Sequence, residues 1–318
     1  MRTSAARSPA WRDADRVATF EHERPRLVGL AYRMLGVRAD AEDVVQDAWL
    51  RWDRAGGRGH GDDGVEVSNT AAWLTTVVSR LALDRLRSRQ RDRAIYVGPW
   101  LPEPVLLARD PVDARSCDPA DLAVRNESLS LGFLHVLERL SPRERVAFVL
   151  TEVFDESHER AGAVVGATAT ASRQLVHRAR RKLADGRPPD AVGAAELAGV
   201  VAAFVAACAT GAVDELLRML APDVVLVSDG GAERHAARRP VVGPERVARL
   251  VAYVARRLPP GTASECTPVN GLPALVVRWR DTPVVVLTLE ATPAGVRRLR
   301  LVLAPSKLGR LDRPTPLA

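Results

Sequence analysis

The chain has 318 residues, 47% of them hydrophobic, which is enough for two or three globular domains and excludes a disordered protein. Lysine and arginine (46) outnumber aspartate and glutamate (39), and the net charge of +7 favours a polyanionic partner. The three cysteines are far apart, so they predict neither a disulfide framework nor a CxxC metal site. No apolar run is long enough to cross a bilayer, and we therefore expect a cytoplasmic protein.

Residues 27–52 contain two runs of apolar side chains at helical spacing, separated near Gly36. They predict two amphipathic helices, and the second helix keeps acidic and amide side chains off its apolar stripe. Most exposed helix faces are polar, so this acidic face alone does not indicate binding. The glycine-rich segment GGRGHGDDG, residues 56–64, predicts a loop.

Residues 71–96 predict one long helix, or two, that begins apolar and ends with arginine at every second position from 85 to 93. This spacing spreads the charges around the helix. The arginines either form an ordinary solvated helix end, where they suit the helix dipole, or contact phosphates.

The segment YVGPWLPEP, residues 96–104, contains three prolines and cannot be helical, because proline fixes φ and donates no backbone hydrogen bond. It predicts an extended connector. A connector that only spaces domains is expected to be polar, whereas Trp100 and Leu101 carry apolar surface that prefers burial. We therefore predict that this segment docks onto another part of the protein.

Residues 126–186 predict a second helical block. Ser141 is a favourable N-cap, Pro142 suits the first position of a helix, and Glu144 completes a capping box. Further on, a turn at Gly166–Ala167 separates a short helix from a helix that Thr168 caps.

The helix after Thr168 has two different faces. Polar and basic side chains lie on one face, and Leu175, Val176, Ala179 and Leu183 on the other. Helix, tight turn and basic helix are typical of a helix-turn-helix, whose second helix enters the major groove. The alternative is a helical hairpin with an ordinary charged face.

The composition changes at Ala194. Two helical stretches in residues 195–220 precede a strand at 223–229 and a helix at 243–258. Three β-branched segments then predict consecutive antiparallel strands: PALVVRWR, TPVVVLTLEA and VRRLRLVLAP. The order predicts an α+β domain with a cone-like interior.

Four segments, taken in order, closely resemble an extracytoplasmic-function sigma factor: AYRMLGVRADAEDVVQDAWLRW, AWLTTVVSRLALDRLRS, LERLSPRERVAFVLTEVF and RQLVHRARRKLA. The domain after residue 194 resembles the SnoaL-like branch of the NTF2 fold, and YVGPWLPEP resembles the linker motif of the SigJ-like sigma factors that carry such a domain. The resemblance implies two all-α sigma domains followed by an α+β cone. It divides the chain into an N-terminal extension (1–19), region 2 (20–96), a linker (97–125), region 4 (126–186), a SnoaL-like domain (194–305) and a terminal segment (306–318).

The resemblance also implies partners and site residues. Core RNA polymerase would bind the acidic helix through the clamp helices of its large subunit, at Asp40, Glu42, Asp43, Gln46 and Asp47. The minus-ten element would be melted and held near Trp73, Arg80, Arg85, Arg87 and Arg89. The minus-thirty-five element would be read at base edges by Thr170, Arg173 and Gln174 and at phosphates by His177, Arg178, Arg180 and Arg181.

In the same group the linker is thought to contact the SnoaL-like domain, which would act as a built-in regulator, inhibiting or activating, in place of an anti-sigma protein. The corresponding residues are Trp100, Leu101, Pro102, Glu103 and Pro104, with Asp229, Gly230, Gly231, Lys307 and Leu308. The chain has DGGAE where the group has DGGGK, and APSKL where it has NPDKL. In region 4, Ala161 and Ser172 replace larger apolar residues, which predicts a thinner core and lower stability.

Two other functions compete with the sigma factor. A one-component regulator would use the helix-turn-helix as reader and the C-terminal domain as sensor, but it would leave the acidic helix and the 73–93 segment without a role. An enzyme would use an acid-base pair of Asp229 and His235 in a cone pocket. The pocket is a more natural place for an unidentified small-molecule ligand. The six histidines lack HxxxH or HExxH spacing, so we predict no metal and no cofactor.

Overall fold

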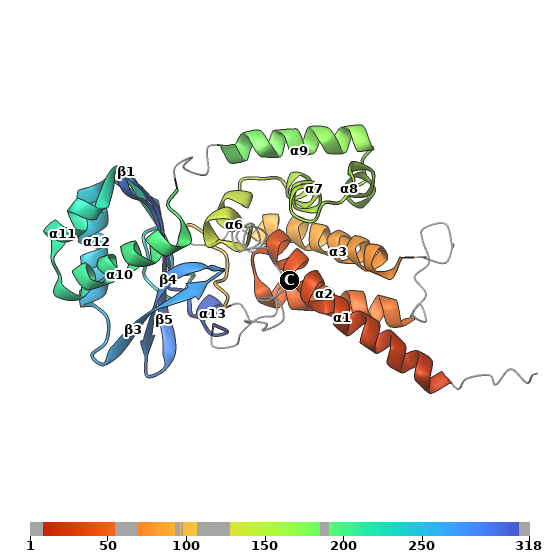
Figure 1. The fold of residues 1–318 in the computed structure, drawn as a ribbon, viewed down its shortest axis with the longest axis horizontal. Coiled ribbons are helices and arrows are strands. Elements are labelled where there is room, and N and C mark those ends of the chain that lie inside the picture. Colours follow the sequence, from red (N-terminus) through yellow and green to blue (C-terminus); the bar gives the residue numbers. More distant parts are fainter. Residues whose placement is uncertain are drawn as a thin grey trace, which may run out of the picture. The chain divides into compact units, whose positions relative to one another are not determined.

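The computed structural model describes residues 9–54, 69–92, 96, 98–106, 128–184 and 191–311, with the backbone alone at 9–15 and 91–92. Several predicted features lie outside these residues: the loop at 56–64, Arg93, Cys117 and the whole linker after Leu106. Contacts divide the described chain into two compact units. Residues up to 88 and 142–176 form the first, and residues 89–141 and those from 177 onward form the second (Figure 1).

In the described part of the first unit, all regular secondary structure is helical. α1 and α2 pack as an antiparallel pair whose facing side chains are fully buried, and Gly36, at φ 68°, provides the turn between them. α3 is tied to α1 by Arg26, which donates to the Thr75 hydroxyl at 2.8 Å. The helices of this unit are α1 (Pro9–Leu35), α2 (Arg38–Arg54), α3 (Thr70–Asp92), α7 (Pro142–Glu152), α8 (His158–Val165) and the first half of α9 (Ala169–Ala184).

Two details of this unit differ from the sequence prediction. α1 begins eleven residues before Phe20 and accommodates Pro25, so part of the predicted N-terminal extension is helix. Ala161 and Ser172 are fully buried as expected. The smaller Ser172 side chain nevertheless makes a polar contact, because its hydroxyl lies 3.4 Å from Nδ1 of His158. The smaller core is therefore partly compensated by a polar contact.

The second unit is built on one six-stranded sheet with strand order β2-β1-β6-β5-β4-β3. All neighbouring strands are antiparallel except β1 and β6. The strands are β1 (Leu220–Asp229), β2 (Val241–Val242), β3 (Thr262–Val269), β4 (Leu272–Trp279), β5 (Thr282–Thr292) and β6 (Gly295–Val302). The three predicted C-terminal strands are confirmed as β4, β5 and β6, whereas β2 and β3 were not predicted.

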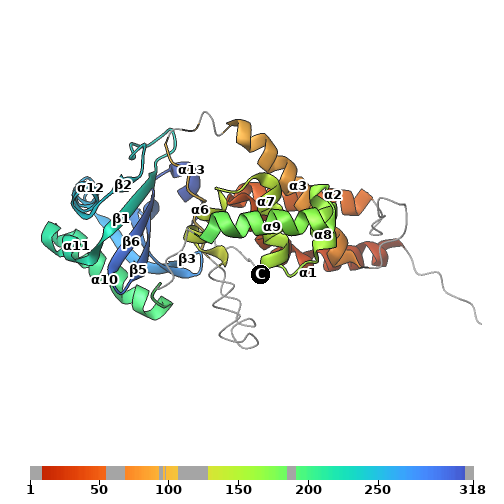
Figure 2. The ribbon, with the colours of Figure 1, turned by 90° about the horizontal axis from the view of Figure 1, so that it is seen from above.

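Helices cover both faces of this sheet (Figures 1 and 2). α10, α11 and α12 enclose the larger apolar core, and the linker, α6 and α13 lie against the opposite face, where Leu101 and Leu131 join a second apolar cluster. The helices are α6 (Leu131–Leu137), α10 (Ala194–Thr210), α11 (Val213–Met219), α12 (Pro244–Arg256) and α13 (Pro305–Leu308). The unit is thus the expected α+β cone, with the linker and α6 added to its outer face.

Candidate promoter-recognition and regulatory sites

The helix-turn-helix is formed by α8 and α9. Ser157 caps α8, Gly166 ends it at φ 68°, and Thr168 accepts the backbone N–H of Ala171 at 3.2 Å. The two helices meet so closely that a Cβ on Gly162 would lie 2.7 Å from the carbonyl oxygen of Ala167. The predicted Thr168 cap and the predicted turn at Gly166–Ala167 are confirmed, the Ser157 cap was not predicted, and glycine is required at 162 by this close approach.

α9 presents its polar face to solvent. Leu175, Val176 and Ala179 are buried on the other side of the helix. All seven residues predicted for the minus-thirty-five element are exposed: Thr170, Arg173, Gln174, His177, Arg178, Arg180 and Arg181. The division between the two units falls within α9, after Val176. Of these side chains, Arg173 pairs weakly with exposed Glu159, at 3.6 Å.

The acidic face of α2 has two parts. Asp43, Gln46 and Asp47 are exposed, and half-buried Glu42 pairs with Arg38 at 2.8 Å. Asp40 is only 8% exposed, and its carboxylate accepts from Arg85 of α3 at 2.8 Å. The exposed part is available to a partner, whereas Asp40 joins α2 to α3 inside the unit.

The residues predicted for the minus-ten element lie along α3. The Trp73 ring is half-buried and packs against the Trp52 ring, with centroids 5.5 Å apart. Arg87 is exposed beside Asp84, and Arg89 is half-buried. Arg80 lies 3.5 Å from the carbonyl oxygen of Ala163 in α8. α3 therefore contacts the helix-turn-helix through a residue that sequence analysis assigned to DNA.

The linker docks on the C-terminal domain through a buried carboxylate. Asp229 accepts four hydrogen bonds, from the Tyr96 hydroxyl (2.6 Å), the Leu101 N–H (2.7 Å), the Gly231 N–H (3.0 Å) and Lys307 Nζ (2.6 Å). Lys307 also donates to the Leu101 carbonyl and lies 4.2 Å from the centre of the Trp100 ring. Burial and the adjacent carboxylate hold the pKa of Tyr96 above its usual range, so the phenol remains a donor. We call this group of contacts the clasp. It consists of the side chains of Tyr96, Asp229 and Lys307 and the backbone of Leu101.

The other residues predicted for this contact lie around the clasp. Pro102, Glu103 and Pro104 are buried, and Leu308 packs with Leu101 in the outer apolar cluster. Gly230 is buried, and a Cβ there would lie 2.2 Å from the carbonyl oxygen of Arg234. The departures from the group's motifs do not remove the clasp, because they spare Asp229 and Lys307, and Glu233 is exposed.

Sequence analysis missed a second fastening at Asn270. This residue is fully buried in the turn between β3 and β4. Its side-chain oxygen accepts from the Val105 N–H at 3.0 Å, its own N–H donates to the Val105 carbonyl at 2.8 Å, and its side-chain amide donates to the Leu129 carbonyl at 2.8 Å. Asn270 therefore fixes the linker and the start of α6 together.

α6 also packs closely on the sheet. A Cβ on Gly132 would lie 2.2 Å from Oε1 of Glu290, which pairs with buried Arg300 at 2.7 Å. His135 is half-buried nearby, and desolvation, followed by the Arg300 charge, lowers its pKa to about 4. His135 is thus neutral at ordinary pH.

The proposed acid-base pair is not assembled. His235 is exposed, and Asp229 uses both oxygens in the clasp. Among the described residues, no cluster of three or more His, Cys, Asp or Glu side chains has a geometry suited to a metal ion. None of the described helices is long and apolar enough to cross a membrane.

Known protein families match the two helical parts of the chain. The family model for sigma-70 region 2 matches residues 19–92, and that for sigma-70 region 4 matches residues 130–183. These matches define a sigma factor of the sigma-70 class, here joined to an α+β cone.

Individual relatives narrow the class. The ECF RNA polymerase sigma factor SigJ of Mycobacterium tuberculosis is 40% identical over 263 residues, which cover 80% of this chain and 78% of SigJ. The probable ECF RNA polymerase sigma factor SigI of the same species is 34% identical over 298 residues, covering 92% and 95% of the two chains. The crystal structure of M. tuberculosis SigJ matches with a TM-score of 0.69 and 34% identity over 92% of this chain and 98% of that one. The chain belongs to the extracytoplasmic-function RNA polymerase sigma factors.

Proposed function

We propose that this sigma factor acts in the cytoplasm and brings core RNA polymerase to promoters through three exposed surfaces. α9 reads the minus-thirty-five element, α3 holds the minus-ten element, and Asp43, Gln46 and Asp47 of α2 dock on the clamp helices of the polymerase. The face of α9 carries the proposal, because its seven candidate DNA contacts are all exposed while its apolar side chains are buried.

The first unit is too compact to engage both promoter elements as it stands. The positions of the elements place their centres about 25 base pairs apart, which is roughly 85 Å of B-DNA. A globular unit of this size is roughly 40 Å across. Within it, α7 packs on α1 and Arg80 contacts α8. Region 4 must therefore separate from region 2 when the factor binds polymerase and promoter together.

We further propose that the C-terminal domain regulates this separation by holding the connector between the regions. The clasp and Asn270 fix residues 96 and 98–106 and the start of α6 to the outer face of the cone. A connector held in this way cannot extend, so the docked state restrains opening. We assign the domain no catalytic role, because Asp229 serves the clasp.

Transcription by purified core polymerase tests both proposals. Full-length protein and a Lys307→Met variant would be compared on candidate promoters, since removing the whole domain would expose Leu101 and Leu131 as well. Transcripts that require the added protein support the sigma function, and more transcript from Lys307→Met supports restraint by the domain. Duplex DNA binding without polymerase, with no transcript, would instead identify a one-component regulator.

A further inference from the structure

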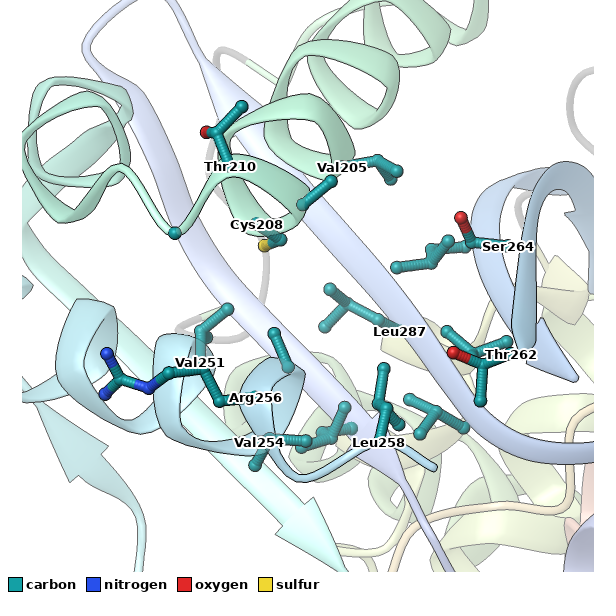
Figure 3. A pocket seen from close by; sticks show the side chains of 17 residues that line it. Val205, Cys208, Thr210, Val251, Val254, Arg256, Leu258, Thr262, Ser264 and Leu287 are labelled. Carbon is teal, nitrogen blue, oxygen red and sulfur yellow. The ribbon is translucent and has the colours of Figure 1, made fainter. Parts of the chain in front are cut away.

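The C-terminal domain contains a cavity of about 570 Å³ on the side of the sheet that α10 and α12 cover (Figure 3). Its walls are α10, α12 and strands β3 to β6. Figure 3 shows the side chains of Cys208, Val251, Val254, Leu258 and Leu287 around a common space. A cavity of this volume is in the range that holds small organic ligands.

The lining selects for a neutral, apolar molecule. Among the lining residues in the described part of the chain, Arg256 carries the one charge, and its guanidinium is exposed and directed away from the common space (Figure 3). Burial raises the pKa of the Cys208 thiol to about 11, so this group is uncharged as well. The remaining polar side chains in the lining carry hydroxyls: Thr210, Thr262 and Ser264. An anionic ligand would lose its hydration without gaining a cation.

The cavity and the linker share the same strands. Successive residues of a strand point to opposite faces of a sheet. Leu275, Leu287 and Leu301 line the cavity, whereas their neighbours Val276, Val286 and Val302 belong to the outer cluster with Leu101 of the linker and Leu131 of α6. One layer of backbone therefore separates a ligand from the docked linker.

We propose that this cavity binds a neutral apolar small molecule and that the sheet couples its occupancy to linker docking. The inference rests on the proposed regulatory role of the domain and adds the class of ligand and the path of coupling. Because interiors are close-packed, a ligand that shifts Leu287 or Leu301 also moves Val286 or Val302. By linkage, a ligand that binds the docked and released states with different affinity shifts the balance between them.

Two fluorescent probes with the same aromatic frame test the site on the full-length protein. N-phenyl-1-naphthylamine is neutral, and 1-anilinonaphthalene-8-sulfonate carries a sulfonate. We expect one neutral probe to bind per chain, at least tenfold tighter than the anion. Equal or tighter binding of the anion would overturn the assignment of ligand class, and failure of the neutral probe to bind would overturn the site.

Substitutions on two independent walls locate the probe. Cys208→Trp on α10 and Ser264→Trp on β3 would place an indole in the cavity, and each is expected to weaken binding at least tenfold. Ala206→Trp and Ala263→Trp are matched controls, because both residues are exposed on the same elements and neither lines the cavity. If the probe binds the two cavity variants and the two control variants with equal affinity, it binds outside this cavity.

Hydrogen exchange of residues 98–106 tests the coupling. Saturating neutral probe should change the exchange rate of these amides at least threefold in the wild type and leave it unchanged in Cys208→Trp. A bound probe without this change would overturn the coupling. Transcription by Lys307→Met reports on the regulatory role separately: if it equals the wild type while the probe binds, the proposed restraint by the domain fails and the ligand site stands.

Discussion

Lys307 Nζ lies 2.6 Å from Oδ2 of Asp229, and both side chains are almost fully buried. The pair joins the last residue of β1 to α13 and, through Leu101, to the linker. A buried ion pair is costly to form, and breaking it by removing one partner leaves an uncompensated charge. The pair is therefore a sensitive point at which to test linker docking.

Lys307→Met is expected to destabilise the docked linker by about 3–5 kcal/mol, because Asp229 would remain buried without its cation. Urea denaturation and hydrogen exchange at 98–106 would measure the loss. The control is Arg249→Met, which removes one partner of an exposed pair with Glu245 and should cost less than about 1 kcal/mol. The double variant Asp229→Asn with Lys307→Met removes both charges and keeps a side-chain acceptor for Tyr96 and Gly231, so it should recover part of the stability. No recovery would contradict the role of the unpaired charge.

Gly132→Ala should destabilise the second unit, although alanine normally stabilises a helix over glycine by about 1 kcal/mol. The added methyl would meet Glu290, which cannot move away without weakening its contact with buried Arg300. Gly199→Ala on α10 is the matched control, since its Cβ would meet nothing within 4 Å and should give the usual gain. A stabilised Gly132→Ala variant would show that α6 is not held tightly on the sheet.

The sequence allowed most elements to be predicted, and the exceptions have physical reasons. β3 was missed because it is an exposed edge strand with polar residues and Pro268, which lack the alternating apolar pattern. Asn270–Gly271, with φ of 54° and 78°, is the hairpin turn that could have revealed it. Trp100 and Leu101 indicated a docked linker, but local pattern carries no information on long-range partners such as Asn270. For the same reason α6, which reads as part of region 4, was not assigned to the cone.

Asp40→Asn and Asp47→Asn should have different effects, although both change an acidic residue of α2. Asp40→Asn weakens the contact with Arg85 and should destabilise the first unit by about 1–3 kcal/mol. Asp47→Asn should leave stability unchanged within about 0.5 kcal/mol and weaken binding to core polymerase. Thermal unfolding and a binding titration with core polymerase would separate the two. If Asp40→Asn loses as much polymerase affinity as Asp47→Asn under conditions where both variants remain fully folded, Asp40 also belongs to the polymerase interface.

Acidification should release α6 from the cone through His135. Its folded pKa, about 4, lies below its ordinary value of 6.5, so between these values the unfolded chain binds a proton that the folded chain does not. The free energy of unfolding therefore includes the full contribution of neutral His135 above pH 6.5, and it is lower by about 2 kcal/mol at pH 5. Arg300 and Arg298 oppose the proton, while Glu138 and a hydrogen bond to the Trp100 backbone favour it. Urea denaturation at pH 7.5 and pH 5 should show a smaller difference for His135→Phe than for His177→Gln; equal differences would exclude His135 as the source.

Substitutions on α9 should distinguish residues that contact bases from residues that contact phosphates. Arg173→Ala and Gln174→Ala are expected to cost about 1–3 kcal/mol on the preferred minus-thirty-five sequence and little on other sequences, because base contacts provide discrimination. Arg180→Ala and Arg181→Ala should weaken binding on all sequences alike and reduce the slope of log affinity against log salt by about one. The measurement is promoter binding by the reconstituted holoenzyme over a salt series, with exposed Arg256→Ala on α12 as the control. If Arg173→Ala lowers affinity uniformly and also reduces the salt slope, then Arg173 binds a phosphate and the orientation of α9 in the groove differs from the one proposed.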